Sequence, residues 1–212
     1  MKNINTKTYW DNRFKSGDWN KGGTYQTTQY AKGNVKHMDI DPRFSGSILD
    51  FGCALGDAIP ILKLSYPNAQ LYGVDISEEA IKICNQNYGQ LAEFKTGSYE
   101  ILGQYDIIIA SHVMEHLTDD KNIVQSLLTK CKTLYIIVPY KENPLYIEHV
   151  NFYEDNYYDD FNVIDKIKYT ISYKKKLHWK GILKSFILLS PAFSYKFSKD
   201  MILFKIKGSL KD

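Results

Sequence analysis

The chain has 212 residues, of which 44% are apolar, 24% charged and 14% aromatic. This apolar content predicts one globular domain with a sizeable core and excludes a disordered or low-complexity protein. No run approaches the roughly 18 apolar residues of a membrane span, and Met1–Trp10 lacks the apolar stretch of a secretory signal, so a cytoplasmic protein without a transmembrane segment is expected. Three cysteines without a C-x-x-C pair predict buried thiols instead of disulfides or a zinc knuckle: Cys53, Cys84 and Cys131.

The formal net charge of +3 is distributed unevenly along the chain. Residues 1–162 hold 15 basic and 21 acidic side chains, whereas residues 163–212 hold 12 lysines and three aspartates. A basic face of this kind attracts an anionic substrate, an anionic partner or a membrane surface. The alternative is a solvated, lysine-rich surface that reflects genomic base composition, since lysines outnumber arginines 25 to 2.

The predicted elements begin with a polar and aromatic segment, residues 1–45, in which we expect only a short helix over Thr8–Phe14, followed by loops. Beyond it, short apolar runs alternate with patterns of helical period. The runs predict strands at Ser47–Phe51, Gln70–Val74, Ala92–Thr96, Tyr105–Ala110 and Thr133–Val138. The helical patterns predict helices at Asp57–Leu64 (ended by Pro67), from an N-cap at Ser77 to Tyr88, and from an N-cap at Thr118 to Lys130.

The remainder of the chain begins with a long aromatic loop, Tyr140–Phe161, which a strand over Val163–Tyr173 follows. A basic amphipathic helix, Leu177–Leu189, and a last strand, Met201–Lys207, complete the prediction. The apolar stripe of this helix suits its own sheet, a homodimer partner or a membrane surface. The alternation of strands and helices predicts βαβ units in an α/β fold, with a mostly parallel sheet covered by helices on both faces.

The sharpest local signal is Asp50-Phe-Gly-Cys-Ala-Leu-Gly-Asp57, which lies between the first strand and its helix. Glycines at this point permit a tight turn and a close approach of the backbone to a ligand. Asp75 ends the next strand, 23 residues after Gly52, and roughly 20 residues is the spacing at which a carboxylate reaches ribose hydroxyls in nucleotide-binding βαβ units. The loop lacks the third glycine of a dinucleotide fingerprint and the Gly-Lys-Ser/Thr ending of a P-loop, and its two flanking acids suit a cationic ligand.

These residues resemble the D/E-x-G-x-G-x-G motif of class I S-adenosylmethionine-dependent methyltransferases. The segments Gly73-Val-Asp-Ile-Ser77, Tyr105-Asp-Ile-Ile108 and Glu115-His-Leu-Thr-Asp119 are also typical of that family. The resemblance covers residues 47–161, and Tyr9-Trp-Asp-Asn-Arg-Phe14 is similar to the N-terminal segment of small-molecule members. Two departures are Ala54 at the middle glycine and Ser98 where an acid commonly contacts the adenine amino group.

The resemblance implies a Rossmann-like sheet of seven strands with the last strand antiparallel, and a methyltransferase domain over residues 46–212 behind an N-terminal cap or lid, residues 1–45. It implies S-adenosylmethionine as cofactor, with the backbone of Gly52–Gly56 around its methionine part and Asp75 on both ribose hydroxyls. Ile76, Gly97 and Ser98 then surround the adenine. The full set of cofactor-binding residues that it implies is Trp10, Arg13, Asp50, Gly52, Cys53, Ala54, Gly56, Asp75, Ile76, Gly97, Ser98, Ser111 and His112.

The histidines allow several interpretations. His112-Val-Met-Glu-His116 matches the H-x-x-E-H pattern of a zinc protease class, but it follows a nucleotide-fold strand. Ubiquinone-pathway and small-RNA O-methyltransferases are similar here, with E-x-x-E-H as a metal cluster. His112 replaces the first glutamate, which weakens a Mg²⁺ site because Mg²⁺ prefers oxygen ligands, so no metal is predicted and His116 is expected to pack under the glycine loop.

The acceptor side is expected in the loop after the fifth strand, where the family places substrate-binding groups. The residues predicted there are Tyr140, Tyr146, Glu148 and His149, with Glu148 orienting His149. His149 is the first candidate for a catalytic base and His112 the second, since an imidazole takes a hydroxyl proton near neutral pH. Trp10, Arg13 and residues 26–28 are expected to form a lid over the cofactor.

The predicted function is transfer of a methyl group from S-adenosylmethionine to a small molecule. Similar bacterial enzymes modify sugars, polysaccharide precursors or secondary metabolites, usually at oxygen, so the resemblance suggests an acceptor oxygen on a molecule of this kind. The acceptor is expected to be anionic or nucleotide-linked, in view of the basic tail. One alternative is an RNA or other nucleic-acid methyltransferase, which the basic tail favours. Against it stand the acidic first three quarters of the chain and the absence of an N/D-P-P-Y/F motif. A non-catalytic S-adenosylmethionine-binding scaffold is the other alternative.

Overall fold

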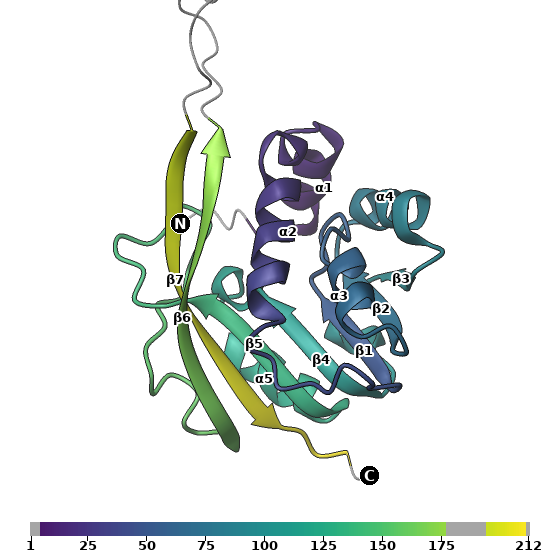
Figure 1. Ribbon diagram of the computed structural model, residues 1–212, viewed down its shortest axis with the longest axis vertical. Coiled ribbons are helices and arrows are strands. Elements are labelled where there is room, and N and C mark those ends of the chain that lie inside the picture. The colour runs from purple at the N-terminus through teal and green to yellow at the C-terminus, as the bar shows by residue number, and fades with distance from the viewer. Residues whose placement is uncertain (1–4, 177–193, 211–212) are drawn as a thin grey trace, which may run out of the picture.

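The computed structural model describes residues 5–176 and 194–210 (Figure 1). Seven strands form one sheet in the order β3-β2-β1-β4-β5-β7-β6. Their bounds are β1 (Ser47–Phe51), β2 (Gln70–Asp75), β3 (Glu93–Thr96), β4 (Tyr105–Ser111), β5 (Cys131–Pro139), β6 (Val163–Lys176) and β7 (Ser194–Lys207). The first five strands are parallel, and β7 runs antiparallel to both β5 and β6. This confirms the predicted Rossmann-like sheet with an antiparallel last strand.

The described helices are α1 (Lys7–Lys15), α2 (Gly23–Asn34), α3 (Ile59–Ser65), α4 (Glu78–Tyr88) and α5 (Asp120–Leu128), with 3₁₀ turns η1 (Trp19–Lys21), η2 (Tyr99–Ile101) and η3 (Met114–His116). Ser77 caps α4 as predicted, since its hydroxyl accepts a hydrogen bond from the Ala80 N–H. No described helix combines the length and the apolar character that a bilayer span needs.

Three predictions about these elements need correction. The part of residues 1–45 that was expected to form loops contains the helix α2. Contacts of Tyr30 and Asn34 with distant residues stabilise this helix. Asp119, not Thr118, is the N-cap of α5, and Thr118 lies in the preceding turn. The last strand begins at Ser194, well before Met201, because it pairs along its length with β6 in a long hairpin. The predicted helix over 177–189 lies outside the described residues.

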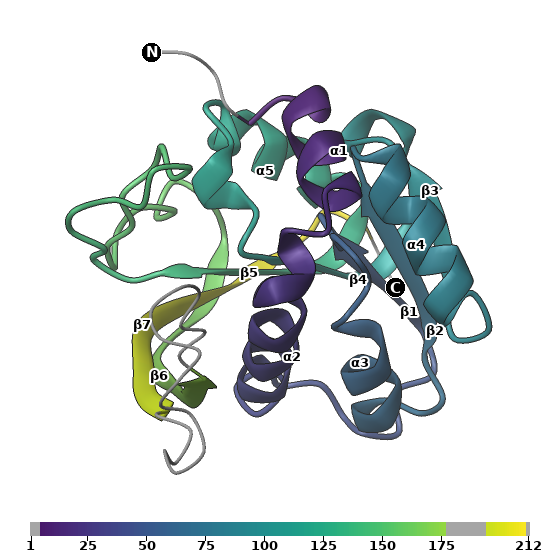
Figure 2. The same cartoon turned by 90° about the horizontal axis from the view of Figure 1, so that it is seen from above.

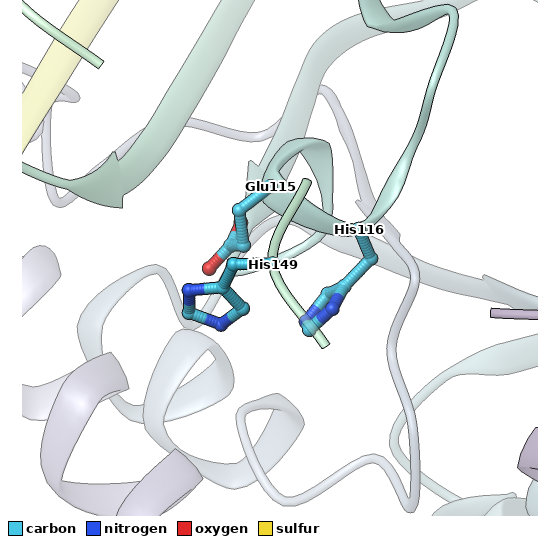
Figure 3. Close-up of side chains that lie close together, drawn as sticks. All are labelled: Glu115, His116 and His149. Atoms are coloured by element: carbon cyan, nitrogen blue, oxygen red, sulfur yellow. The ribbon is translucent and has the colours of Figure 1, made fainter. Parts of the chain in front are cut away.

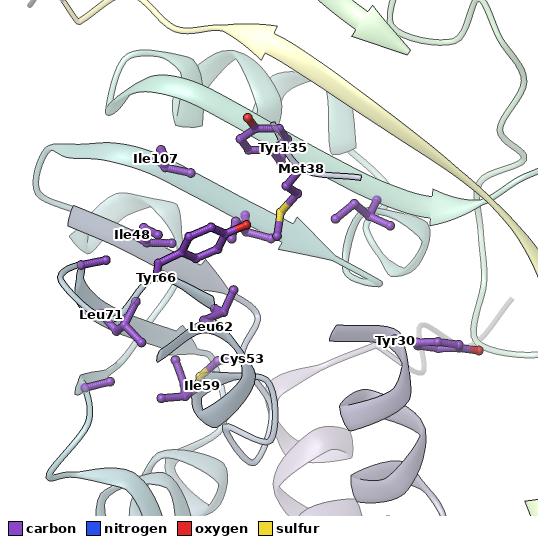
Figure 4. Packing of buried hydrophobic residues seen from close by; sticks show 14 of the residues in the cluster. Tyr30, Met38, Ile48, Cys53, Ile59, Leu62, Tyr66, Leu71, Ile107 and Tyr135 are labelled. Carbon is purple, nitrogen blue, oxygen red and sulfur yellow. The ribbon is translucent and has the colours of Figure 1, made fainter. Parts of the chain in front are cut away.

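Helices cover both faces of the sheet (Figure 2). The main core accordingly has two layers, one on each face. On one face, α2 and α3 and the segments after them contribute Tyr30, Met38, Ile59 and Leu62 to a cluster that also includes Tyr135 of β5 (Figure 4). The alternating residues of the same strands point to the opposite face, as the two-residue period of a strand requires. The three cysteines are buried and free, as predicted.

The opposite face is covered by α5 and the segment after β5. Val124 and Leu127 of α5 pack with Tyr158 and Phe204 in this second layer. Asp120, which is 4% exposed, accepts hydrogen bonds from the hydroxyls of three tyrosines: Tyr153 (3.1 Å), Tyr157 (3.2 Å) and Tyr158 (2.7 Å). This shared carboxylate fixes residues 153–158 against the start of α5, and thereby fixes the end of the loop that precedes them.

Candidate active site

A cavity of about 780 Å³ lies at the carboxyl ends of β1 and β4, where open α/β sheets bind ligands. Its walls come from four parts of the chain: the glycine loop after β1, the turn after β4, residues 140–149 after β5, and residues 197–200 of β7. The α1–α2 segment forms a further wall, with Trp10, Arg13, Gln26 and Thr27 among its lining residues. The predicted lid residues therefore line the cavity, except for Thr28.

The glycine loop has the backbone that its sequence predicts. Gly52 and Gly56 have φ angles of +75° and +76°, a region that glycine adopts without strain. A Cβ on Gly52 would lie 2.3 Å from Val113 Cγ2, so no other residue fits there without displacement of the turn after β4. Ala54 also has a positive φ, +48°, and its N–H donates to Asp75 Oδ2 over 2.9 Å. Gly52, Cys53 and Ala54 line the cavity.

The predicted adenosine contacts lie outside this cavity. Asp75 is 9% exposed, and its second oxygen accepts a hydrogen bond from the Ser77 N–H (2.9 Å). The α1 helix lies against the start of α4 here, because the Ser77 hydroxyl donates to Asp11 Oδ1 (2.6 Å). Ile76, Gly97, Ser98 and Gly56 are not among the cavity-lining residues. The structure therefore groups the predicted cofactor residues in two sets, of which only one lines the cavity.

Two buried carboxyls lie beneath the glycine loop. Asp50, at the end of β1, lines the cavity and is 6% exposed. Burial and the neighbouring Asp75 carboxyl raise the pKa of Asp50 to about 7. Burial also raises the pKa of Asp75, to about 6, although the backbone N–H groups of Ser77 and Ala54 oppose the rise. The pKa values of both carboxyls therefore lie near neutral pH, and the two acids suit a cationic ligand.

His112 follows β4 directly, and its ring contacts Tyr30 and Glu115. Its φ is +58°, and its ring stacks on Tyr30 with centroids 4.1 Å apart. Its Nδ1 lies 3.1 Å from Glu115 Oε1. Burial alone would raise the pKa of Glu115, but the hydrogen bond from His112 and the nearby imidazoles lower the pKa to about 2. The ionised carboxylate only accepts hydrogen bonds, so His112 donates to it from Nδ1, and in the neutral ring the lone pair then lies on Nε2.

The side chain of Ser111, which precedes His112, is oriented by a hydrogen bond from α2. Its hydroxyl accepts a hydrogen bond from the Asn34 side-chain amide of α2 over 2.9 Å. Both Ser111 and His112 line the cavity beside the glycine loop, where the resemblance places the methionine part of the cofactor.

His149 and His116 lie side by side in the lining of the cavity (Figure 3). Their ring centroids are 4.9 Å apart, and Trp10 packs edge-on against His116 at 5.3 Å. His116 thus lies beneath α1 and faces a second imidazole, instead of packing only under the glycine loop. Burial lowers the pKa of His116 to about 4, which keeps its ring neutral.

The prediction that Glu148 orients His149 is wrong. His149 Nδ1 hydrogen-bonds the carboxylate of Glu142, which also pairs with Lys199 of β7 (2.7 Å). The carboxylate of Glu148 instead forms an ion pair with Arg13 of α1. Adjacent residues 148 and 149 point in different directions, so their carboxylate and imidazole do not meet.

The four predicted acceptor-side residues all line the cavity: Tyr140, Tyr146, Glu148 and His149. Sequence reasoning missed Glu142, Lys199 and Tyr30, which also line it. Glu142 lies in the predicted acceptor loop and could have been considered there. Lys199 and Tyr30 reach the site only through the β6–β7 hairpin and through α2, and no local pattern marks them.

Comparison with known proteins finds a family model that matches the part of the chain holding much of this site. Residues 49–134 match a family model described as a methyltransferase domain, a segment that holds the glycine loop, Asp75 and the turn after β4. The match spans less than half of the chain. It supports an S-adenosylmethionine-dependent class I methyltransferase, with S-adenosylmethionine as the cofactor.

Solved structures share the fold at low sequence identity. A chain of the complex between the Haloferax volcanii Trm112 methyltransferase activator and a putative methyltransferase is 16% identical, with 74% of this chain and 78% of that chain covered and a TM-score of 0.62. A putative RNA methyltransferase from Pyrococcus horikoshii is 12% identical (coverage 88% and 85%, TM-score 0.56). A coclaurine N-methyltransferase bound to N-methylheliamine and SAH is 14% identical (coverage 66% and 50%, TM-score 0.54). These similar proteins differ in acceptor, so the comparison leaves the acceptor open.

Proposed function

We propose that the protein transfers a methyl group from S-adenosylmethionine to an oxygen of a small molecule, such as a sugar, a polysaccharide precursor or a secondary metabolite. The observation that carries the proposal is a single cavity lined by the glycine loop on one side and by residues 140–149 on the other. Its volume, about 780 Å³, falls within the roughly 300–1,000 Å³ of small-molecule sites. The α1–α2 segment covers it, which favours a small acceptor over a polynucleotide.

In this proposal the cofactor lies across the carboxyl ends of β1 and β2. Backbone groups of residues 52–54 contact its methionine part, and the carboxyl of Asp50 offsets its positive charge. Asp75 has two oxygens, of which each already accepts one N–H, and a carboxylate has about four acceptor positions. It therefore retains capacity for both ribose hydroxyls. Asp11 of α1 bonds Ser77 beside Asp75, and we propose that this contact opens when the cofactor enters.

Methyl transfer from a sulfonium is an in-line displacement in which the acceptor oxygen attacks the methyl carbon and S-adenosylhomocysteine leaves. Positioning supplies most of the rate. We propose His112 as the base that takes the hydroxyl proton, because Glu115 holds its Nδ1 and its Nε2 is buried without a partner among the described residues. His149 has the same arrangement with Glu142, but it lies in the loop after β5, whereas His112 directly follows β4.

Two measurements test the proposal. Calorimetric titration with S-adenosylhomocysteine should give micromolar binding, and NAD should give none. Transfer of a labelled methyl group should then be followed into the low-molecular-weight and RNA fractions of a cell extract. Label in the small-molecule fraction that falls about 100-fold or more in a His112→Asn variant, but not in a His37→Asn control, supports the proposal. Label in RNA alone would refute the small-molecule acceptor, and binding without any transfer would favour a scaffold protein.

A further inference from the structure

Glu115, His116 and His149 present a carboxylate and two imidazoles to one point (Figure 3). One ligand atom from each lies within 4.8 Å of the others. Donor atoms at the roughly 2.0–2.1 Å bond lengths of a tetrahedral zinc site are about 3.4 Å apart. Each donor would therefore move by less than about 1 Å to share an ion. We infer that these three residues form a site for a divalent transition-metal ion.

The hydrogen bonds of His116 and His149 use Nδ1 and leave Nε2 of each ring for a metal ion. His116 Nδ1 lies 3.1 Å from the Glu148 carbonyl oxygen, which can only accept, so the ring donates there and keeps its Nε2 lone pair. His149 Nδ1 donates to the Glu142 carboxylate in the same way. A metal-binding histidine typically donates its second N–H to a carboxylate or a backbone carbonyl, which fixes the ring and its tautomer. Both histidines show this arrangement.

Glu115 supplies an independent observation. Its side chain is 1% exposed, and Oε2 has no hydrogen-bond partner among the described residues, whereas Oε1 accepts from His112. A buried carboxylate oxygen without a partner is costly to the fold. A cation bound between Oε2 and the two imidazoles would satisfy it.

The charges nearby are compatible with a dication. Two cavity-lining cations are paired with carboxylates, Arg13 with Glu148 and Lys199 with Glu142. The donor set itself carries one negative charge when both imidazoles are neutral. Two nitrogens and one oxygen favour Zn²⁺, Co²⁺ or Fe²⁺ over Mg²⁺, which prefers oxygen. Three protein ligands leave a coordination position for a further group, as in catalytic zinc sites.

All three ligands line the cavity, so the open position would face the acceptor. Bound there, the ion would hold an acceptor oxygen and lower the pKa of its hydroxyl. This use of the ion rests on the proposed function, whereas the existence of the site does not.

The test is metal binding by the full-length protein, without a histidine tag and after treatment with a chelator. Zn²⁺ is titrated by calorimetry, and Co²⁺ by the visible absorption of the bound ion. We expect one ion per chain, and an affinity lower by about 100-fold or more in Glu115→Gln and in His149→Gln, since even outer-shell changes cost about 10–100-fold. Glu142→Gln should cost about 10-fold.

His37→Gln is the matched control, because His37 stacks on Tyr169 away from the cavity (4.0 Å between centroids) and should bind like the wild type. If Glu115→Gln does not fold, as judged by circular dichroism, His149→Gln decides. Absence of Zn²⁺ and Co²⁺ binding, unchanged affinity in the ligand variants, or preference for Mg²⁺ would overturn the inference. S-adenosylhomocysteine is titrated separately, so loss of cofactor binding with intact metal binding would refute only the proposed function.

Discussion

Asp50 makes the stability of this protein depend on pH in a way that one substitution can reveal. Its carboxyl is buried at the end of β1 beside Asp75, and its pKa rises from 3.8 to about 7. A carboxyl with a raised pKa binds its proton more tightly in the folded state than in the unfolded state. The stability it contributes is therefore fully present below about pH 4 and is lost as the pH rises through about 7.

The contribution of Asp50 to the free energy of unfolding follows from its ordinary pKa and its pKa in the folded protein. A difference between 3.8 and about 7 corresponds to about 4 kcal/mol, at about 1.4 kcal/mol for each tenfold change in proton affinity. The Asp50→Asn variant has no proton to lose at this position. Between pH 4 and pH 8, the free energy of unfolding of the variant should therefore fall by about 4 kcal/mol less than that of the wild type.

The assay is urea unfolding followed by circular dichroism at several pH values, with the change between pH values compared across variants. Asp165→Asn is the control, because Asp165 is exposed on β6. It should follow the wild type at every pH. Parallel pH profiles for Asp50→Asn and the wild type would show that Asp50 is ionised in the folded protein, and would refute the reasoning from its burial.

Two further predictions concern the cofactor and the tyrosine network. Asp75→Asn should weaken S-adenosylhomocysteine binding by about 2 kcal/mol, because it removes the charged acceptor for two ribose hydroxyls; unchanged calorimetric affinity in a folded variant would remove Asp75 from the site. Asp120→Ala should lower the free energy of unfolding by about 4 kcal/mol, because it strands three tyrosine hydroxyls, two of them on fully buried side chains. Urea unfolding measures this loss, and a value near that of Tyr157→Phe, about 1 kcal/mol, would mean that the hydroxyls find other partners.

The parallel half of the sheet could be predicted because each element carries its own local signal. Buried strands are continuous apolar runs, and glycine or aspartate ends them. Ser77 followed by Glu78 and Glu79 marks the start of α4, since the hydroxyl caps the helix and the acids favour its positive end. Such signals need no knowledge of the rest of the chain.

The α2 helix could not be predicted because its stability comes from distant residues. Its sequence, GTYQTTQYAKGN, contains two glycines and three threonines, which are poor helix formers. Tyr30 stacks on His112, and Asn34 bonds both Ser111 and the Tyr169 hydroxyl (2.7 Å). Tertiary contacts of this kind override weak intrinsic propensity.

The partners of His149 were equally beyond sequence reasoning. Glu142 reaches the ring from seven residues away through the path of a loop without regular structure, and Lys199 arrives through a hairpin strand. The turn that presents Glu115 and His116 is held from the same loop, because the Asn151 side-chain amide donates to the carbonyls of Met114 (2.9 Å) and Leu117 (2.7 Å). The motif His112-Val-Met-Glu-His116 is visible in the sequence, but its geometry depends on Asn151, 35 residues after His116.

The distribution of buried polar atoms links stability to function. Four cavity-lining side chains have a buried atom without a hydrogen-bond partner in the described part of the chain: Arg13 Nε, Trp19 Nε1, His112 Nε2 and Glu115 Oε2. Each such atom costs about 1–3 kcal/mol, and a fold tolerates breaks in local consistency mainly at functional sites. Ligands that supply partners for these atoms bind the folded state alone and raise its stability by mass action. The same atoms that weaken the empty fold are therefore the ones best placed to recognise what enters the cavity.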